Sequence, residues 1–261
     1  MELNVRAVNL TFDEKTNKLY SDGVEVPSSV RKLSEMKDVI YNKNFINEKN
    51  KDDVLYYMFR GAGEYKNATI FEAHKIRYDV TVVMPYDLGG EFNKTLGHYH
   101  PICNEKENLA YPEIYEVISG EAMYLLQKHE SDDHYDIKLI RARKGDKVIM
   151  EPNYGHITIN VGKTPLVMAN LVNSTFKSDY EPIKRMGGGA LFVTNKKRIV
   201  YNTNYKDTSV MDLNAQKLQF LDYKKSIYDE YLANPEHFIF LNRPEYLLWK
   251  QDNWAVKSQM F

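Results

Sequence analysis

The sequence is organised around Lys94-Thr95-Leu96-Gly97-His98-Tyr99-His100-Pro101. We expect a β-strand here, and alternate side chains of a strand share a face, so His98 and His100 would project together. Neutral imidazoles are common ligands of divalent metals, and two of them on one strand face can bind one ion. The pair alone is equally typical of two surface histidines on an exposed strand, so further ligands are needed to decide.

Length and composition exclude several classes of protein. The chain has 261 residues, enough for one large β-domain or two ordinary ones. Its 35 Lys and Arg against 36 Asp and Glu give a net charge of -1, with no basic excess for nucleic acid. Cys103 is the single cysteine, which is typical of a reducing compartment. Without a recognisable signal peptide or an apolar run of about 20 residues, we expect a cytoplasmic protein with no membrane or nucleic-acid partner.

The middle of the chain predicts a barrel or sandwich. Turn signals such as Ser119-Gly120 and Lys144-Gly145-Asp146 separate many short β-rich runs. Short strands at close and even spacing are typical of these architectures and not of βαβ units. The predicted strands are Val54–Phe59, Ile76–Met84, Lys94–His100, Glu113–Ile118, Ala122–Lys128, Ile137–Arg141, Lys147–Met150, His156–Asn160, Leu166–Leu171, Ala190–Thr194 and Arg198–Tyr201.

The segment before the barrel predicts a hairpin and a helix. Residues 7–26 alternate weakly and contain two turn signals, as in a hairpin or meander. Ser28-Ser29 can cap a short helix, because the apolar positions from Val30 to Ile40 have helical spacing. We therefore expect residues 1–53 to form an N-terminal hairpin and helix segment that packs on a barrel of residues 54–201.

The segment after the barrel predicts helices. The spacing of apolar residues becomes helical over Val210–Leu232. A second helix is predicted to begin at Asn242-Arg243-Pro244 and to include Trp249 and Trp254, since proline is tolerated in a first helical turn. Residues 202–261 are therefore expected to be a helical C-terminal extension, packed on the barrel or on a partner subunit.

Two more candidate ligands follow the histidine pair. Glu113 begins one predicted strand and His156 begins another. His98, His100, Glu113 and His156 together offer three imidazoles and one carboxylate, which can hold an octahedral metal with two positions open for substrate oxygens. Taken singly, Glu113 could be a solvent-facing carboxylate and His156 a core histidine, but their joint occurrence favours a metal site.

The spacing of these four residues resembles that of the cupin superfamily. The first cupin motif is a His-x-His pair followed by a Glu and a Gly with six residues between them, which here are Glu113 and Gly120. The second motif corresponds to Gly145, Pro152, His156 and Asn160. The long gap after His100 implies an insertion at residues 104–112 and leaves Glu107 and Glu116 as other carboxylate candidates. The resemblance implies a mainly β fold, a double-stranded β-helix or jelly-roll barrel.

Within the cupins, the sequence is similar to the metal-dependent glucose-6-phosphate isomerases of archaea and some bacteria. The strongest match is Thr95-Leu96-Gly97-His98-Tyr99-His100, supported by Glu113-Ile114-Tyr115 and Asn160-Val161-Gly162. The resemblance covers roughly residues 28–200. It implies a homodimeric aldose–ketose isomerase that interconverts glucose 6-phosphate and fructose 6-phosphate in glycolysis or gluconeogenesis.

The same resemblance implies roles for individual residues. His98, His100, Glu113 and His156 would bind one divalent metal, with Fe²⁺ favoured and Mn²⁺, Ni²⁺ or Zn²⁺ compatible with the same donors. Other residues would contact the phosphosugar: Thr81, Thr95 and the backbone of Gly97 at the phosphate, and Tyr115 at the sugar. A tyrosine in Val54-Leu55-Tyr56-Tyr57, with Tyr57 favoured over Tyr56, would add a further contact.

Some choices stay open at this point. Glu113 and Tyr115 are the candidate catalytic residues, but a carboxylate that binds the metal is a poor base, so proton transfer and direct hydride shift are both possible. Val172 and Ser178 stand where the family tends to carry a tyrosine and a histidine, which leaves the physiological sugar open. The alternatives in function are a cupin iron dioxygenase and a sugar-binding cupin without turnover.

Overall fold

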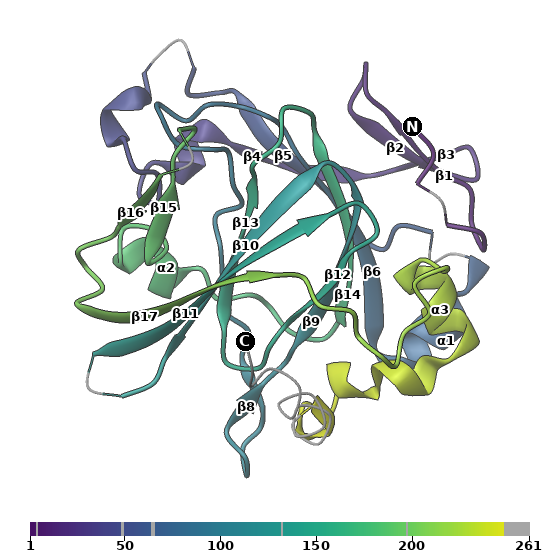
Figure 1. Cartoon of the computed structure of the whole chain (residues 1–261). Helices are drawn as coiled ribbons and strands as arrows, with labels where there is room; N and C mark the ends of the chain where they lie inside the picture. Colours follow the sequence, from purple (N-terminus) through teal and green to yellow (C-terminus); the bar gives the residue numbers. More distant parts are fainter. Residues whose placement is uncertain (4, 48–49, 64–65, 132, 197, 248–261) are drawn as a thin grey trace.

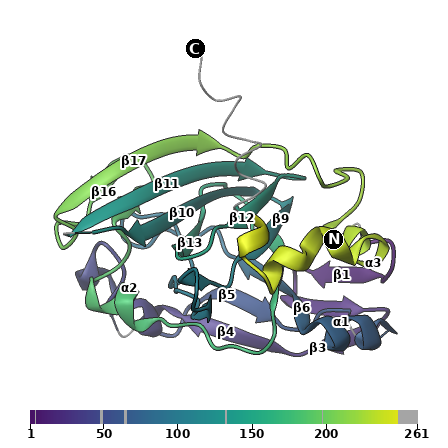
Figure 2. The same cartoon turned by 90° about the horizontal axis from the view of Figure 1, so that it is seen from below.

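Two β-sheets, antiparallel except for the pair β11–β17, face each other across the interior of the molecule (Figures 1 and 2). The structure, a computed structural model, describes residues 1–247 apart from 4, 48–49, 64–65, 132 and 197. The first sheet has the order β13-β10-β11-β17 and the second the order β12-β9-β14-β6-β5-β4. Their strands are β4 (Ser28–Lys32), β5 (Val54–Phe59), β6 (Ile76–Val83), β9 (Glu113–Ser119), β10 (Glu121–His129), β11 (His134–Arg143), β12 (Lys147–Met150), β13 (Gly155–Asn160), β14 (Leu166–Asn173) and β17 (Asp207–Asn214).

Hydrophobic side chains from both sheets fill the space between them. In the first sheet Leu125 of β10 lies opposite Ile157 of β13 and Leu139 of β11, and all three belong to one buried cluster. Met168 of β14 joins this cluster from the second sheet. Burying a side chain of this size contributes about 1.5–3 kcal/mol, so the register that turns these residues inward is strongly preferred.

A second core covers the outer face of the six-stranded sheet. Every residue of β14 is buried, because its side chains meet the barrel interior on one face and a helical layer on the other. In that layer the hydroxyl of Tyr228 donates to the Gly63 carbonyl at 2.7 Å, and the ring of Tyr228 packs edge-on against that of Tyr78. The layer consists of α1 (Ala68–His74), α3 (Ile227–Ala233) and the 3₁₀ segment Pro235–Leu241 (Figure 2).

Shorter elements surround the barrel. The predicted meander is a three-stranded sheet, and the predicted insertion contains the β7–β8 hairpin. The bounds are β1 (Leu10–Asp13), β2 (Lys18–Ser21), β3 (Val24–Val26), β7 (Ile102–Asn104), β8 (Leu109–Ala110), β15 (Leu191–Val193), β16 (Ile199–Tyr201), α2 (Glu181–Arg185) and the 3₁₀ turns Leu33–Met36 and Lys43–Phe45.

The predicted barrel is confirmed, and two strands, Val54–Phe59 and Lys147–Met150, have the predicted ends. The arrangement is the mainly β, two-sheet barrel of the cupin class. Helices α1 and α2 were missed, because each is at most seven residues long and too short to show helical periodicity. No helix in the described part of the chain is long and apolar enough to cross a membrane.

The helix predicted from Ser28 to Ile40 is wrong in its first half. Residues 28–32 form β4, which pairs antiparallel with β5, and Val30 lies opposite Tyr57. A 3₁₀ turn, Leu33–Met36, then buries Leu33 and Met36. As the edge strand of the sheet, this stretch satisfies its backbone by pairing with β5, whereas a helix of under four turns would depend on packing for its stability.

The helix predicted over Val210–Leu232 is wrong except at its C-terminal end, because residues 210–226 contain no helix. Residues 207–214 form β17, which runs parallel to β11, and an Arg141–Asp212 ion pair joins the two strands. Helix occurs only at Ile227–Ala233, where the Ser226 side chain accepts a hydrogen bond from the Asp229 N–H at 3.0 Å. The predicted helix with Trp249 and Trp254 lies outside the described residues.

Two strands extend beyond the predicted limits of the barrel. β4 lies within residues 1–53 and β17 within residues 202–261, yet both are hydrogen-bonded to strands of the barrel. The C-terminal segment also packs on the barrel through the Ile227 N–H, which donates to a Glu116 carboxylate oxygen at 2.8 Å. The division into segments 1–53, 54–201 and 202–261 stays a prediction.

Candidate metal centre

The histidine pair lies in an extended segment beside β13. The predicted strand Lys94–His100 pairs through isolated bridges, Lys94 with Ile159, His98 with His156 and Tyr99 with Asp179. In the second bridge the His98 N–H donates to the His156 carbonyl at 3.3 Å, and the His156 N–H donates back at 3.0 Å. The segment is therefore not a regular strand. It nevertheless brings His98 and His100 next to His156 of β13.

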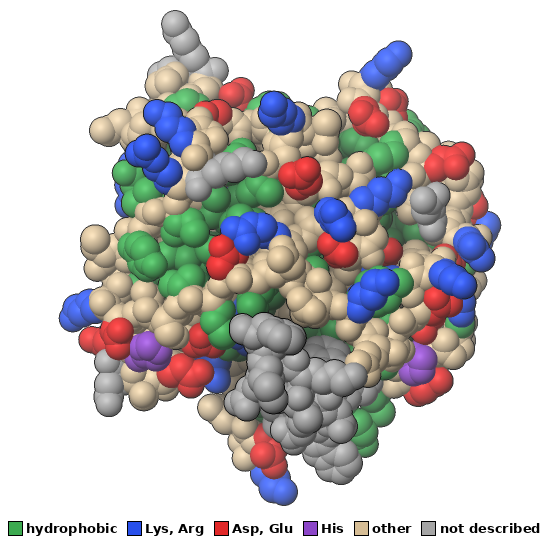
Figure 3. Space-filling model, in the orientation of Figure 1, with side chains coloured by type: hydrophobic (Ala, Val, Ile, Leu, Met, Phe, Trp, Pro, Cys, Tyr) green, Lys and Arg blue, Asp and Glu red, His purple; other side chains and the backbone are tan. Residues whose placement is uncertain are grey.

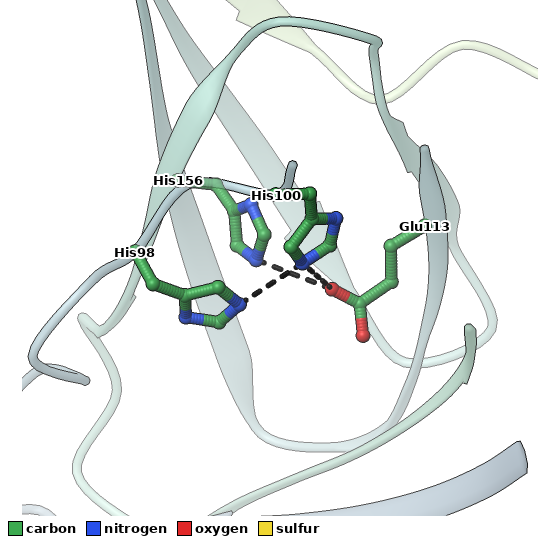
Figure 4. Close-up of side chains that lie close together, drawn as sticks. All are labelled: His98, His100, Glu113 and His156. Atoms are coloured by element: carbon green, nitrogen blue, oxygen red, sulfur yellow. Dashed lines mark hydrogen bonds and ion pairs between the residues drawn. The ribbon is translucent and has the colours of Figure 1, made fainter. Parts of the chain in front are cut away.

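Four side chains, two from this segment and one each from β9 and β13, point toward one another at this place (Figure 4). Nε2 of His98 lies 3.1 Å from Nε2 of His100. Oε2 of Glu113, at the start of β9, lies 3.2 Å from Nε2 of His156 and 3.6 Å from Nε2 of His100. The four donor atoms all lie within 4.8 Å of one another, so the structure brings together the residues that the sequence predicts as a set.

The spacing of these donors fits a divalent metal ion. Ligands about 2.1 Å from a metal and at right angles to each other are about 3.0 Å apart, close to the observed separations. Both ring nitrogens of His156 are buried and have no hydrogen-bond partner within the described chain. Buried polar atoms normally have partners, and Nε2, the nitrogen that faces the other three side chains, is placed to bind a ligand between them. The group suggests a divalent metal site.

A surrounding layer of contacts orients the donors. Nδ1 of His100 is 2.9 Å from the Tyr111 carbonyl, so the N–H sits on Nδ1 and the lone pair of Nε2 faces the cluster. Nδ2 of Asn170, on β14, donates to Oε1 of Glu113 at 2.5 Å. With Oε1 held in this way, Oε2 is the oxygen that faces the imidazoles.

The electrostatics of the cluster favour the protonation states that bind metals. Burial, helped by neighbouring imidazoles, lowers the pKa of His98 well below its usual value. Burial likewise lowers the pKa of His100 to about 4, so both rings are neutral at pH 7. Burial alone would raise the pKa of Glu113, but contact with His156 and the nearby His100 outweigh it and hold that pKa below its usual value. Neutral imidazoles and an ionised carboxylate are the forms that coordinate metals.

The cluster lies in a pocket that also holds most of the predicted substrate residues. Thr81, Thr95, Gly97 and Tyr115 all line it. Burial and the nearby Glu113 carboxylate raise the pKa of Tyr115 well above its usual value, so its hydroxyl keeps its proton and acts as a donor.

The prediction of Tyr57 as a substrate contact needs correction. Tyr56 lines the pocket, while Tyr57 packs against the hydrophobic cluster on the opposite face of β5. The reason is the alternation of side chains along a strand, which lets only one of two successive residues face the barrel interior. The Tyr56 hydroxyl accepts hydrogen bonds from the Leu96 N–H and from Arg31, both at 3.2 Å.

The pocket also contains charged and polar residues that the sequence analysis missed. Arg60 and Arg77 line it, and both are bonded to the buried Asp79. Asn170 reaches Glu113 from β14. Arg77 and Asp79 stand two positions apart in the strand that contains Thr81, so alternation could have placed them on the pocket face. Arg60 follows the end of β5 and carried no such signal.

Comparisons with known proteins identify the family. A family model described as "Glucose-6-phosphate isomerase (GPI)" matches residues 30–209. The chain is 28% identical over 180 residues to the glucose-6-phosphate isomerase of Thermococcus onnurineus, covering 68% of this chain and 87% of that one. It is 28% identical over 182 residues to that of Thermococcus litoralis, covering 68% and 86%. A putative glucose-6-phosphate isomerase 2 of Rhizobium meliloti is 31% identical over 137 residues, covering 52% and 60%. The chain therefore belongs to the glucose-6-phosphate isomerase family.

Proposed function

We propose that this protein interconverts glucose 6-phosphate and fructose 6-phosphate, using one divalent metal per chain held by His98, His100, Glu113 and His156. The observation that carries the proposal is the convergence of these four donors in a pocket that also presents Thr81, Thr95 and Tyr115. Family membership supplies the reaction class. Fe²⁺ is the favoured ion, and the reaction belongs to glycolysis or gluconeogenesis in the cytoplasm.

The reaction moves a hydrogen between two adjacent carbons, one carrying a hydroxyl and the other a carbonyl. A divalent ion at the four donors supplies Lewis-acid stabilisation of the negative charge that develops on the two substrate oxygens. The hydroxyl of Tyr115 keeps its proton and can donate a hydrogen bond to one of these oxygens. The hydroxyl of Thr81 and the backbone of Gly97 can take part in holding the phosphate.

Glu113 acts in this proposal first as a ligand. Its pKa is lowered, and its Oε1 is held by Asn170. A carboxylate in this state is a weak base, since a good general base has a pKa near the working pH. Glu113 is also the only carboxylate among the described residues that line the pocket. Proton transfer from carbon would therefore require Oε1 to leave Asn170. A hydride shift between the carbons needs no base at carbon, and the hydroxyl proton then has to pass only from one substrate oxygen to the other.

A coupled assay of glucose 6-phosphate formation from fructose 6-phosphate tests this function. We expect turnover that a chelator abolishes and that Fe²⁺ or Mn²⁺ restores, because the developing charge loses its counter-ion when the metal is removed. Absence of turnover with every added metal would contradict the proposal. Oxygen consumption in the same mixtures without formation of glucose 6-phosphate would instead favour a dioxygenase.

We also propose that the protein is a homodimer. Hydrophobic side chains gather on the face of the molecule around β15 and β16 (Figure 3). There Ile199 is 37% exposed and Tyr201 57% exposed, and Met211 and Leu213 are exposed on the neighbouring β17. Exposed apolar patches are typical of surfaces that contact another protein. Light scattering should give twice the mass of one chain, and the mass of a single chain at micromolar concentration would contradict the dimer.

A further inference from the structure

One wall of the pocket carries two arginines that share a single carboxylate. Nη1 of Arg60 lies 2.6 Å from Oδ2 of Asp79. Arg77 donates to the same group from Nε, 2.8 Å from Oδ1, and from Nη2, 2.9 Å from Oδ2. Asp79 is buried, whereas the side chains of Arg60 and Arg77 are 47% and 28% exposed and line the pocket. One carboxylate balances one guanidinium, so this wall presents one excess positive charge to the pocket.

Strand register places this wall opposite the metal-binding residues. Asp79 of β6 lies opposite Asn170 of β14, and Asn170 lies opposite Tyr115 of β9 and bonds to Glu113. Two strand spacings, about 10 Å, therefore separate the backbone of β6, which carries Arg77 and Asp79, from that of β9, which carries Glu113. A phosphohexose carries its reacting carbons at one end and its phosphate at the other. When the reacting carbons lie at the four donors, the phosphate is directed to the wall formed by β6.

Residues near Arg60 and Arg77 also favour this wall as the position of the phosphate. Thr81 lies two residues from Asp79 on the same face of β6, and its cross-strand neighbour Met58 contacts Nη2 of Arg60 at 3.9 Å. Arg60 and Thr81 are therefore both neighbours of Met58, and all three line the pocket. Val172 lies opposite both Arg77 and Glu113 in the sheet register and has no hydrogen-bonding group. Arg77, and not Val172, is the donor at this point of the wall.

The charge of the pocket matches a phosphate group. The guanidiniums of Arg60 and Arg77 outnumber the Asp79 carboxylate by one charge, and a divalent ion would outnumber the Glu113 carboxylate by one. The loaded pocket would therefore carry two positive charges. Phosphate groups on biological molecules carry about −1.5 to −2 charges at pH 7. Arginine also suits this ligand, because its planar fork donates two parallel hydrogen bonds to phosphate oxygens.

We propose that Arg60 and Arg77, held in place by Asp79, bind the phosphate of the substrate and select phosphorylated over unphosphorylated sugars. This inference rests on the proposed function and adds the residues that set its substrate class. The hydroxyls of Thr81 and Thr95 complement the arginines with neutral hydrogen bonds. Asp79 is a positioning residue, since it contacts the guanidiniums and does not line the pocket.

Binding of a ligand that cannot turn over tests the inference. Sorbitol 6-phosphate has no carbonyl group, and its affinity for the metal-loaded protein can be measured by calorimetry beside that of sorbitol. Arg60→Gln and Arg77→Gln should each weaken sorbitol 6-phosphate binding about 10- to 100-fold, the usual loss for a hydrogen bond to a charged group. Sorbitol should bind these variants as it binds the unchanged protein. The KM for fructose 6-phosphate should rise by a similar factor, with a smaller change in kcat.

Two further variants separate binding from folding. Arg60→Lys and Arg77→Lys keep the charge beside Asp79 but lose the fork, so their losses should be smaller than those of the glutamine variants. Arg141→Gln, which removes an arginine from an exposed ion pair with Asp212, should leave both affinities unchanged. Melting temperature and metal content, measured on every variant, show whether the fold and the metal site are intact.

The possible outcomes distinguish this inference from the proposed function. Unchanged sorbitol 6-phosphate affinity in both glutamine variants, with intact fold and metal content, would overturn the role of the arginines even where isomerisation persists. Equal losses for sorbitol and sorbitol 6-phosphate would also overturn it, because selection of phosphate would then lie elsewhere. Arginine-dependent phosphate binding without isomerisation at any metal would uphold the anion site and reject the isomerase.

Discussion

His156→Ala is expected to abolish metal retention and, with it, isomerase turnover. The substitution removes one of four donors whose spacing fits a single ion. Metal affinity should fall by more than about 100-fold, since loss of even a residue that only supports a ligand commonly costs 10- to 100-fold. Elemental analysis after gel filtration should find the variant without metal.

Thermal unfolding gives an independent measurement of the same change. A metal that binds only the folded state raises the melting temperature, so the unchanged protein should melt higher with added Mn²⁺ and His156→Ala should not. Without metal the two proteins should melt within a few degrees of each other. The lost packing of His156 is offset by the removal of two buried nitrogens that lack hydrogen-bond partners.

A histidine outside the cluster provides the control. His129 is exposed at the end of β10, and its ring contacts that of Tyr135 at a tilt of 47°. His129→Ala should keep full metal content and turnover. Retention of one metal per chain by His156→Ala would show that the ligand assignment is wrong.

Gly97→Ala should cost about 2–6 kcal/mol of folding stability and weaken metal binding as well. Gly97 has a φ of +84°, where a side chain causes strain of about 1–3 kcal/mol. An added Cβ would also overlap Cγ1 of Ile157 and come within 3.2 Å of the His156 carbonyl oxygen. Overpacking of this kind costs about 1–3 kcal/mol more, and any relief by movement displaces the backbone that carries His98 and His156.

Gly145→Ala separates the effect of backbone strain on stability from that of overpacking. Gly145 has a similar φ of +89°, but an added Cβ there would meet no atom within 4 Å. Denaturant unfolding of metal-free protein should therefore show the strain alone in Gly145→Ala and a loss larger by about 1–3 kcal/mol in Gly97→Ala. Equal losses in the two variants would mean that close packing against Ile157 does not restrict this position.

The barrel could be predicted from sequence because its signals are local. Turn residues such as Ser119-Gly120 punctuate runs of β-formers, and Val54–Phe59 and Lys147–Met150 end where those runs end. Strand β17 could not be predicted in this way. Its partner β11 lies more than 60 residues earlier in the chain, and pairing with a distant sheet edge overrode the helical spacing of its apolar residues.

The donor set was predictable for a different reason. Motif spacing selected Glu113, and the structure places the other candidates elsewhere: Glu107 is exposed, and Glu116 accepts a hydrogen bond from Ile227. The choice of Tyr57 over Tyr56 failed because sequence shows that side chains alternate without showing which set faces inward.

Sequence motifs could not predict the pocket wall formed by Arg60 and Arg77. Thr81 was assigned to the pocket, and the same alternation places Arg77 and Asp79 beside it. Arg60 reaches Asp79 only because β5 and β6 pair side by side, which brings the end of β5 next to this carboxylate. Contacts of this kind between two strands follow from tertiary structure, and no regular spacing of residues in the sequence indicates them.

The central claim is that one divalent ion, held by three imidazoles and one carboxylate inside the barrel, is required for isomerisation of a phosphosugar. Titration of metal-free protein with Mn²⁺ tests it most directly, with bound metal and fructose 6-phosphate turnover measured on the same samples. Turnover should rise in proportion to bound metal and stop rising at one ion per chain. Full turnover in metal-free protein, or metal bound at one ion per chain without any turnover, would contradict the account.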